Sequence, residues 1–309
     1  MPSTIHIQKK LEYAGHRGSI FAMTTSKDEQ WLFTSGDDGV VASWELPTGS
    51  IDGKAVFTIN KSIYSLCYLE GLNKLVAGAS DGTAYLIDLA KKEVTHTYQR
   101  SKESIYHLFF HAPSHTIWLL LGKGFLARLD ADDFTELSVE RLAKDNLRSL
   151  VHYPERNALF VGTSDNRIIE LDDQYFRPIQ HWEAHENSVF SLLVHPDTHL
   201  LLSGGRDAYL KAWDLQQQEV AEVRSLPAHN FTINDIALSP SRDYFATASR
   251  DKTIKIWDAY SLELLKVIDL LRNQGHKHSV NKLKWLKSDN SLISCGDDRR
   301  IIRWELGFS

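Results

Sequence analysis

Short runs of apolar residues, separated by turn residues, recur along the whole chain. The stretch Ile233–Leu238 is followed by the turn residues Ser239–Asp243 and by a second apolar run, Tyr244–Ala248. After the polar turn Arg250–Lys252, apolar and polar residues alternate over Thr253–Trp257. A period of two is typical of a β-strand with one buried face. No stretch has a convincing helical period, so we expect an all-β fold.

A tryptophan or aliphatic residue followed by an acidic residue marks each of seven repeats. The marks are Trp44-Glu45, Ile87-Asp88, Leu129-Asp130, Leu171-Asp172, Trp213-Asp214, Trp257-Asp258 and Trp304-Glu305. Successive marks lie 43, 42, 42, 42, 44 and 47 residues apart. Seven such repeats, each with four short strands, predict a seven-bladed β-propeller with four-stranded antiparallel blades. We expect it to form a single domain over residues 1–309.

Four of the repeats share four residue types at fixed offsets. A histidine lies 28 residues before the tryptophan, a serine or threonine ten before it and an aspartate six before it. The sets are His16, Thr34, Asp38 and Trp44; His185, Ser203, Asp207 and Trp213; His229, Thr247, Asp251 and Trp257; and His276, Ser294, Asp298 and Trp304. With these repeats the chain resembles the WD-repeat family. The resemblance implies a buried hydrogen-bonded network in each of the four blades.

Repeats two to four depart from this pattern. They carry Ile87, Leu129 and Leu171 in place of the tryptophan, and they have apolar residues at the hydroxyl position as well. Because both partners of a hydrogen bond are replaced together, the exchange costs little. We therefore expect apolar packing instead of the network in these blades.

The last repeat lacks a sequence for its outer strand, since only Leu306–Ser309 follow the final mark. The segment Thr4–Leu11 stands before His16 as Glu219–Leu226 stands before His229. We expect this N-terminal strand to complete the seventh blade and close the ring, which would also remove exposed sheet edges.

The resemblance also places a partner-binding rim on one face of the propeller, the top. In this family, the third and fifth residues after the histidine position and the residue before the aspartate point to that face. The candidate binding residues are Phe21, Tyr64, Tyr106, Arg148, Phe190, Arg206, Arg250, Asp37 and Asp297. Aromatic side chains and arginines are enriched at protein interfaces. The small third positions, mostly serines, are expected to leave the aromatics open from the side. The alternative is that the aromatics only pack between blades.

Catalytic, metal and cofactor sites are not expected. A histidine, a serine and an aspartate could form a hydrolytic triad, but catalysis needs one site and the set recurs four times. The nucleotide-binding loops and the zinc motifs are absent. Two histidine pairs, His111 with His115 and His195 with His199, flank prolines in predicted turns and are interpreted as solvated. The alternative function is a small-ligand or metal site in the central channel.

Charge and cysteine content limit the partners further. The net charge is −5, which argues against nucleic acid and anionic membranes as partners. Arg299, Arg300 and Arg303 form the sharpest basic cluster and are interpreted as a solvated strand face. The two cysteines, Cys67 and Cys295, are interpreted as reduced core residues, which fits a cytoplasmic protein. The expected function is a non-enzymatic scaffold that presents its top face to a protein or peptide.

Overall fold

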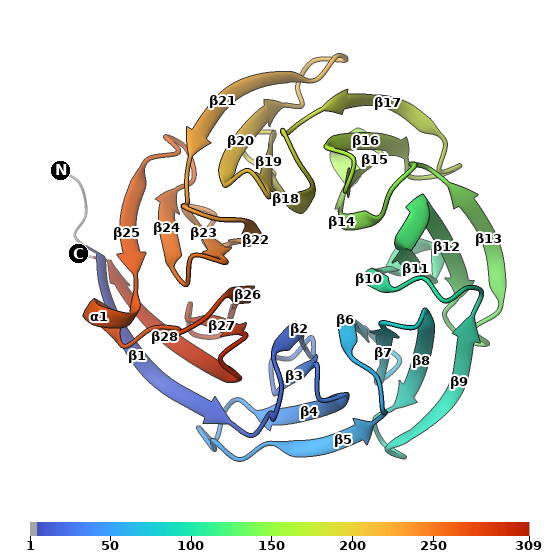
Figure 1. Cartoon of the computed structure of the whole chain (residues 1–309), viewed down its shortest axis with the longest axis horizontal. Coiled ribbons are helices and arrows are strands. Elements are labelled where there is room, and N and C mark those ends of the chain that lie inside the picture. Colours follow the sequence, from blue (N-terminus) through green and yellow to red (C-terminus); the bar gives the residue numbers. More distant parts are fainter. Residues whose placement is uncertain (1–4, 309) are drawn as a thin grey trace. The chain divides into compact units, whose positions relative to one another are not determined.

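The computed structural model describes residues 5–308. Thr4, the first residue of the expected N-terminal strand, lies outside the described residues. Seven four-stranded sheets account for the strands of the described chain. In six of them the strands are neighbours in sequence order. The fold is the all-β, seven-bladed β-propeller that the repeats predicted (Figure 1).

Two compact units divide the described residues, one formed by residues 13–148 and the other by residues 5–12 and 149–308. The first, called the smaller unit, holds the first three blades. Their strands are β2 (Ile20–Thr25), β3 (Trp31–Gly36), β4 (Val40–Glu45) and β5 (Lys54–Thr58); β6 (Ile63–Leu69), β7 (Lys74–Ala79), β8 (Thr83–Asp88) and β9 (Glu93–Gln99); and β10 (Ile105–His111), β11 (Thr116–Leu121), β12 (Phe125–Asp130) and β13 (Glu136–Arg141). The single domain over residues 1–309 remains a prediction.

The larger unit holds blades four to seven, apart from the first two residues of β14 and the last two of β1. Their strands are β14 (Leu147–Tyr153), β15 (Ala158–Thr163), β16 (Arg167–Asp172) and β17 (Pro178–Glu183); β18 (Val189–His195), β19 (Leu200–Gly205), β20 (Tyr209–Asp214) and β21 (Ala221–Pro227); β22 (Ile233–Leu238), β23 (Tyr244–Ser249), β24 (Ile254–Asp258) and β25 (Leu264–Ile268); and β26 (Val280–Trp285), β27 (Leu292–Gly296), β28 (Arg300–Phe308) and β1 (Ile5–Ala14). The seventh sheet has the order β1-β28-β27-β26, so the N-terminal strand lies beside β28.

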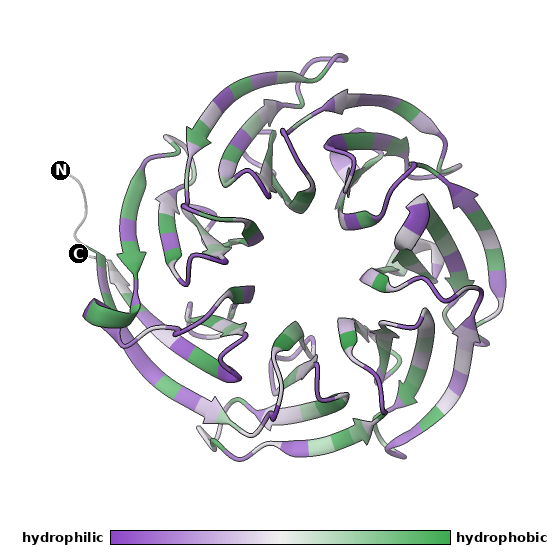
Figure 2. Ribbon diagram, viewed as in Figure 1, coloured by the Kyte–Doolittle hydropathy of each residue, from purple (hydrophilic) through white to green (hydrophobic). Residues whose placement is uncertain are grey.

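Burial within a blade explains the apolar pattern of the sequence. The second strand is almost wholly buried, as in β11 and β15, where all six residues are buried. The outer strand is mostly exposed, as in β21. Figure 2 shows that hydrophilic and hydrophobic residues alternate along the outer strands. Strands with one buried face therefore lie at the outside of each blade, and strands buried on both faces lie within it.

Helical residues are few in the described chain. They form the 3-10 turns η1 (Ala112–Ser114), η2 (Gly122–Gly124) and η3 (Pro154–Arg156) and one short helix, α1 (Leu270–Asn273). The sequence pattern did not predict α1, which is too short to have a detectable period. It forms because the Asp269 carboxylate accepts a hydrogen bond from the Arg272 N–H at 2.7 Å and caps the first turn.

The arginine cluster of the last blade is not the solvated face that the sequence suggested. Arg299 is exposed, but Arg303 is only 7% exposed and pairs with Asp289 at 2.7 Å. Arg300 is half-buried and pairs with Glu12 of β1. The interpretation was wrong for these two residues because β1 lies outside β28, so that β28 is not the edge of its sheet.

The histidine pairs are also placed differently from the prediction. His111 and His195 are buried at the ends of β10 and β18, whereas His115 and His199 are half-buried in the following turns. The His195 ring bonds the carbonyl oxygen of Arg242 at 2.8 Å. For His111 and His195 the solvated interpretation was therefore wrong, since local carbonyl and hydroxyl partners satisfy the buried rings.

Candidate protein-binding residues

The four sets of residues at fixed offsets form hydrogen-bonded tetrads. In the sixth blade the His229 ring bonds Asp251 through Nδ1 at 2.9 Å and the Thr247 hydroxyl through Nε2 at 2.7 Å. Trp257 donates its indole N–H to the same hydroxyl at 2.9 Å. The same three bonds join His16 with Asp38, Thr34 and Trp44, His185 with Asp207, Ser203 and Trp213, and His276 with Asp298, Ser294 and Trp304.

The protonation states follow from burial and from these bonds. Burial lowers the pKa of His229 below its ordinary value, which favours the neutral ring. Burial alone would raise the pKa of Asp251, but the hydrogen bonds from His229 and neighbouring groups outweigh it and lower this pKa. A neutral histidine donating to an ionised aspartate leaves no group of the tetrad unpaired. Each tetrad is suited to stabilising its blade, because its polar groups are hydrogen-bonded to one another.

Blades three and four contain polar networks that the sequence analysis missed. In blade three, Trp118 donates to the Thr116 hydroxyl, which bonds Ser114, and Ser114 bonds His111. The signal in the sequence was Trp118 itself, which stands inside an apolar run. The interpretation of this blade as apolar throughout was therefore incomplete.

In blade four, the buried Glu170 pairs with Arg156 at 2.7 Å. Arg156 also donates to the carbonyl oxygens of Leu215, Gln217 and Gln218 in the β20–β21 turn of blade five. The pair therefore fastens two blades of the larger unit. No fixed offset relates these partners, so they could not be recognised in the sequence.

A recurrent backbone bond defines one end of the blades, called the top end here. The N–H of the residue before the aspartate position donates to the carbonyl of the third residue after the histidine position, at 2.8–3.0 Å. The pairs are Asp37 with Ser19, Ser80 with Ser62, Gly122 with Ser104, Arg206 with Ser188, Arg250 with Thr232 and Asp297 with Ser279. Two of the three candidate positions thus meet at the top end of each of these blades.

The fifth position is a β-bulge in six innermost strands. The register skips one residue in β2, β6, β10, β18, β22 and β26, and the skipped residues are Phe21, Tyr64, Tyr106, Phe190, Asn234 and Asn281. A bulge leaves one residue unpaired and turns its side chain away from the regular alternation. These are the fifth positions counted in the sequence, and the structure shows that each of the six is a bulge residue.

In the smaller unit, four of the candidate residues form one continuous stack, called the aromatic stack. The rings of Phe21 and Tyr64 meet edge to face with centroids 5.4 Å apart. Those of Tyr64 and Tyr106 are parallel within 3° at 6.1 Å. The Arg148 guanidinium lies 4.1 Å above the centre of the Tyr106 ring. All four side chains are half-buried, so the stack keeps part of its surface open to solvent.

Both a carboxylate, Asp37, and a guanidinium, Arg148, act on Tyr64 of the stack. Burial, the neighbouring Tyr106 and the carboxylate of Asp37 raise the pKa of Tyr64, against the effect of Arg148. Asp37 accepts a hydrogen bond from the Ser62 hydroxyl at 2.8 Å, and Ser104 donates to the carbonyl of Ser80 at 2.7 Å. The third positions were expected only to leave space beside the aromatics. Ser62 and Ser104 in addition link adjacent blades through their hydroxyl groups.

In the larger unit, the candidate residues fall into two sets. Arg206 and Arg250, called the arginine pair, are exposed, and neither forms an ion pair with a described residue. Beside Arg250 lies Phe231, which is 59% exposed and whose carbonyl accepts a hydrogen bond from Ser249. Phe231 was not among the predicted binding residues, because it occupies the second position after the histidine. Phe190 is half-buried.

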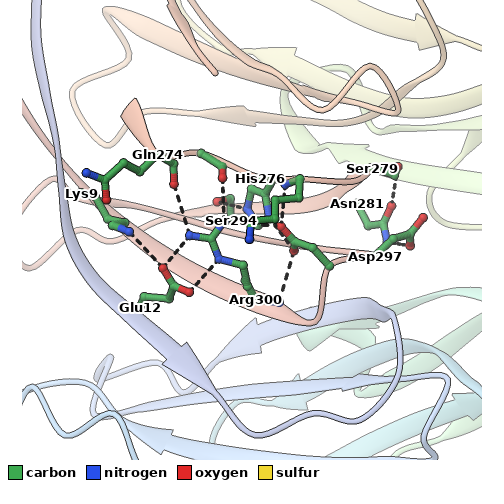
Figure 3. A network of polar contacts seen from close by, with 12 residues as sticks. Lys9, Glu12, Gln274, His276, Ser279, Asn281, Ser294, Asp297 and Arg300 are labelled. Carbon is green, nitrogen blue, oxygen red and sulfur yellow. Dashed lines mark hydrogen bonds and ion pairs between the residues drawn. The ribbon is translucent and has the colours of Figure 1, made fainter. Parts of the chain in front are cut away.

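Asp297 belongs to a second set, which is polar and internally bonded. Asn281 donates to Asp297 at 2.7 Å and accepts from the Ser279 hydroxyl at 2.9 Å, as Figure 3 shows. Asn234 donates to Ser279 and to the carbonyl of Val280. Asp297 is therefore already engaged, unlike the arginine pair.

Within residues 5–308, no group of three or more histidines, cysteines or carboxylates is arranged to hold a metal ion. The same residues include no helix with the length and apolar character needed to cross a bilayer. Cys295 is buried and Cys67 half-buried, and neither is in a disulfide. Burial raises the pKa of the Cys67 thiol to about 12, so this thiol is protonated at neutral pH.

A known family model matches the four repeats that contain the tetrads. The family model described as "WD domain, G-beta repeat" matches residues 7–45, 176–214, 221–258 and 267–305, which together make up half of the chain. These segments contain the four tetrads. The chain belongs to the WD40 family.

Individual relatives are more distant. The chain is 21% identical to Striatin-3 of Mus musculus over 237 residues, which cover 70% of this chain and 30% of that protein. It is 22% identical to the Striatin homolog of Dictyostelium discoideum over 238 residues, covering 66% of this chain and 29% of the relative. The chain thus spans about 30% of the length of the relatives it matches.

Proposed function

We propose that this chain is a non-enzymatic binding platform that holds a protein or peptide at the top ends of its blades. The observation that carries the proposal is the aromatic stack of Phe21, Tyr64, Tyr106 and Arg148. Its members are half-buried, and the three aromatic ones stand at bulges, so they present aromatic surface to solvent. Rigid aromatic residues and arginine contribute most of the binding energy at many protein interfaces.

The stack favours binding over simple packing in one respect. Three aromatic side chains filling only the space between blades would be covered, as Trp44 and Trp304 are. Tyr64 and Tyr106 retain accessible surface, and their parallel rings offer a flat apolar area next to a cation. A partner side chain that is apolar and carries an adjacent acceptor would fit this combination.

The arginine pair and Phe231 offer a second contact area, in the larger unit. Two exposed guanidinium groups favour carboxylates, and Arg binds them through paired hydrogen bonds. The polar set around Asp297 is a weaker candidate because its groups bond one another. A location in the cytoplasm forms part of this proposal, supported by the two free cysteines.

Affinity capture from a lysate of the expressing cells tests the proposal. We expect a protein to be retained by the wild type and lost from the Tyr64→Ala/Tyr106→Ala variant, with a smaller loss for Arg206→Ala/Arg250→Ala. The matched control is Tyr175→Ala/Arg177→Ala, which removes another exposed aromatic–arginine contact, at 6.0 Å, in blade four.

Two results would contradict the proposal. If all variants of verified fold capture the same proteins, the top ends are not the binding surface. If none captures a protein and a screen finds a metal or metabolite instead, the chain is a small-ligand propeller.

A further inference from the structure

The connection between blades six and seven is longer than its counterpart one blade earlier. Residues 228–232 join β21 to β22, whereas residues 269–279 join β25 to β26. The extra residues form α1 and account for the wider spacing, 47 residues, between the last two repeat marks. This insertion is not needed for the blade architecture, since the other blades are built without it.

The insertion displays leucines to solvent. Leu271 is 94% exposed and Leu270 is 41% exposed, and Leu264 of the adjacent strand β25 is 45% exposed. Figure 2 shows α1 as a hydrophobic segment beside β25 and β1. These three residues are called the leucine patch. Single exposed apolar residues are ordinary, but a cluster of large ones next to a groove is typical of an interaction site.

A groove of about 500 Å³ lies beside the patch, within the larger unit. It is lined by His6 and Ile7 of β1, by residues 264–267 of β25 and by Arg272 with Asn273 of α1. Its side chains with ionisable groups are His6, Lys266 and Arg272, and all three are basic. Two acids flank the lining in the sequence: Glu263 directly precedes Leu264, and Asp269 caps α1 and forms an ion pair with Arg272 at 3.7 Å.

The insertion is held rigidly in place. The Gly275 N–H donates to the carbonyl of Asp269 at 3.0 Å. Arg300 donates to the carbonyls of Gly275 and Gln274, and it also bonds Glu12 of β1 (Figure 3). The leucines are therefore presented on a fixed support, which lowers the entropy that binding would cost.

From the exposed leucines, the basic groove and the rigid support, we propose that the leucine patch is a docking site for a short acidic segment of a partner protein. The segment carries leucine-like side chains that cover Leu270 and Leu271, and carboxylates that face Lys266 and Arg272. This site lies on the outer strands of the larger unit and uses none of the top-end residues, so it is independent of the proposed function.

Fluorescence anisotropy with two labelled synthetic peptides tests the site. One peptide contains leucines and glutamates, and the other has lysine in place of every glutamate. We expect the acidic peptide to bind the wild type roughly tenfold more tightly than the basic one. Leu270→Ser/Leu271→Ser should weaken the acidic peptide by about tenfold, and Lys266→Glu should remove the preference between the peptides.

Val223→Ser is the matched control, because Val223 is 52% exposed on β21 and remote from the groove in the sequence. It should bind the acidic peptide as the wild type does, and so should the Tyr64→Ala/Tyr106→Ala variant. Equal affinity for both peptides, no binding of the acidic peptide, or no effect of the leucine substitutions would overturn the proposal. So would self-association in sedimentation, or adsorption to anionic vesicles, that depends on Leu271.

Discussion

At the scale of single residues, the tetrads tie stability to a few buried hydrogen bonds. The Thr247 hydroxyl meets both the His229 ring and the indole N–H of Trp257, so loss of one member leaves the others unpaired. An unpaired buried polar group costs more than the bond contributed. The tetrad residues therefore act on folding.

His229→Ala should lower the free energy of unfolding by about 3 kcal/mol, because it removes a buried hydrogen bond from both Asp251 and Thr247 and opens a cavity. Chemical denaturation measures this loss. Arg206→Ala, at an exposed position, should change it by less than about 0.5 kcal/mol. Equal losses for the two variants would show that the network does not carry the stability assigned to it.

Glu170→Gln should also be costly, since it leaves the Arg156 guanidinium largely buried without its carboxylate. Breaking one partner of a buried ion pair costs about 3 kcal/mol or more. The exposed pair of Arg242 with Asp197 is the control, and Arg242→Ala should cost less than about 1 kcal/mol. Similar effects in a denaturation series would contradict the inter-blade role of Glu170.

The tetrads could be predicted from the sequence because their members stand at fixed offsets in a repeated frame. Glu170 with Arg156 and the His111–Trp118 chain could not be predicted. Each network lies within a single blade, and its partners obey no spacing that the other repeats share. The burial of Arg303 was missed for a related reason, since it depends on Asp289 and on the distant strand β1.

At the scale of elements, the N-terminal strand has the largest predicted effect. β1 lies beside β28, and Glu12 of β1 accepts two bonds from Arg300, at 2.7 and 2.6 Å. Deleting residues 1–11 removes most of this strand and exposes β28. We expect a clear fall in melting temperature, measured by calorimetry, and an unchanged value would refute the role of the strand.

The Glu12–Arg300 pair should make this strand sensitive to acid. The hydrogen bonds from Arg300, acting against burial, lower the pKa of Glu12 from 4.5 to about 2. A carboxylate whose pKa is depressed in the folded state stabilises it above the unfolded pKa, and the effect is lost as pH falls through the folded pKa. The stability difference between wild type and Glu12→Gln should thus be constant above about pH 5 and shrink towards pH 2.

Denaturation of both proteins at a series of pH values measures this difference. A gap that stays constant down to pH 2 would contradict the assignment of the depressed pKa to Glu12.

The strands followed from the sequence because alternation and turn residues are local signals. The bulges were not predicted, since nothing in the residues themselves distinguishes Phe21 or Asn234 from a paired strand residue. The helix α1 was missed because four residues give no period, although the spacing of 47 residues indicated extra chain in this repeat.

At the scale of the whole molecule, the regular spacing of the marks was sufficient to predict seven blades. The contacts among the candidate residues were not predictable. Phe21, Tyr64, Tyr106 and Arg148 lie about one repeat apart in the sequence, and only the packing of neighbouring blades brings their side chains into one stack. Repetition therefore predicted the fold and the positions, but not whether these residues touch one another.

Isothermal titration of a purified captured partner tests the central claim most directly. For the Tyr64→Ala/Tyr106→Ala variant, folded by circular dichroism, we predict at least about tenfold weaker binding than for the wild type or the Tyr175→Ala/Arg177→Ala control. Wild-type affinity in the stack variant, accompanied by a large loss of stability, would mean that the aromatics only pack between blades and that the partner binds elsewhere.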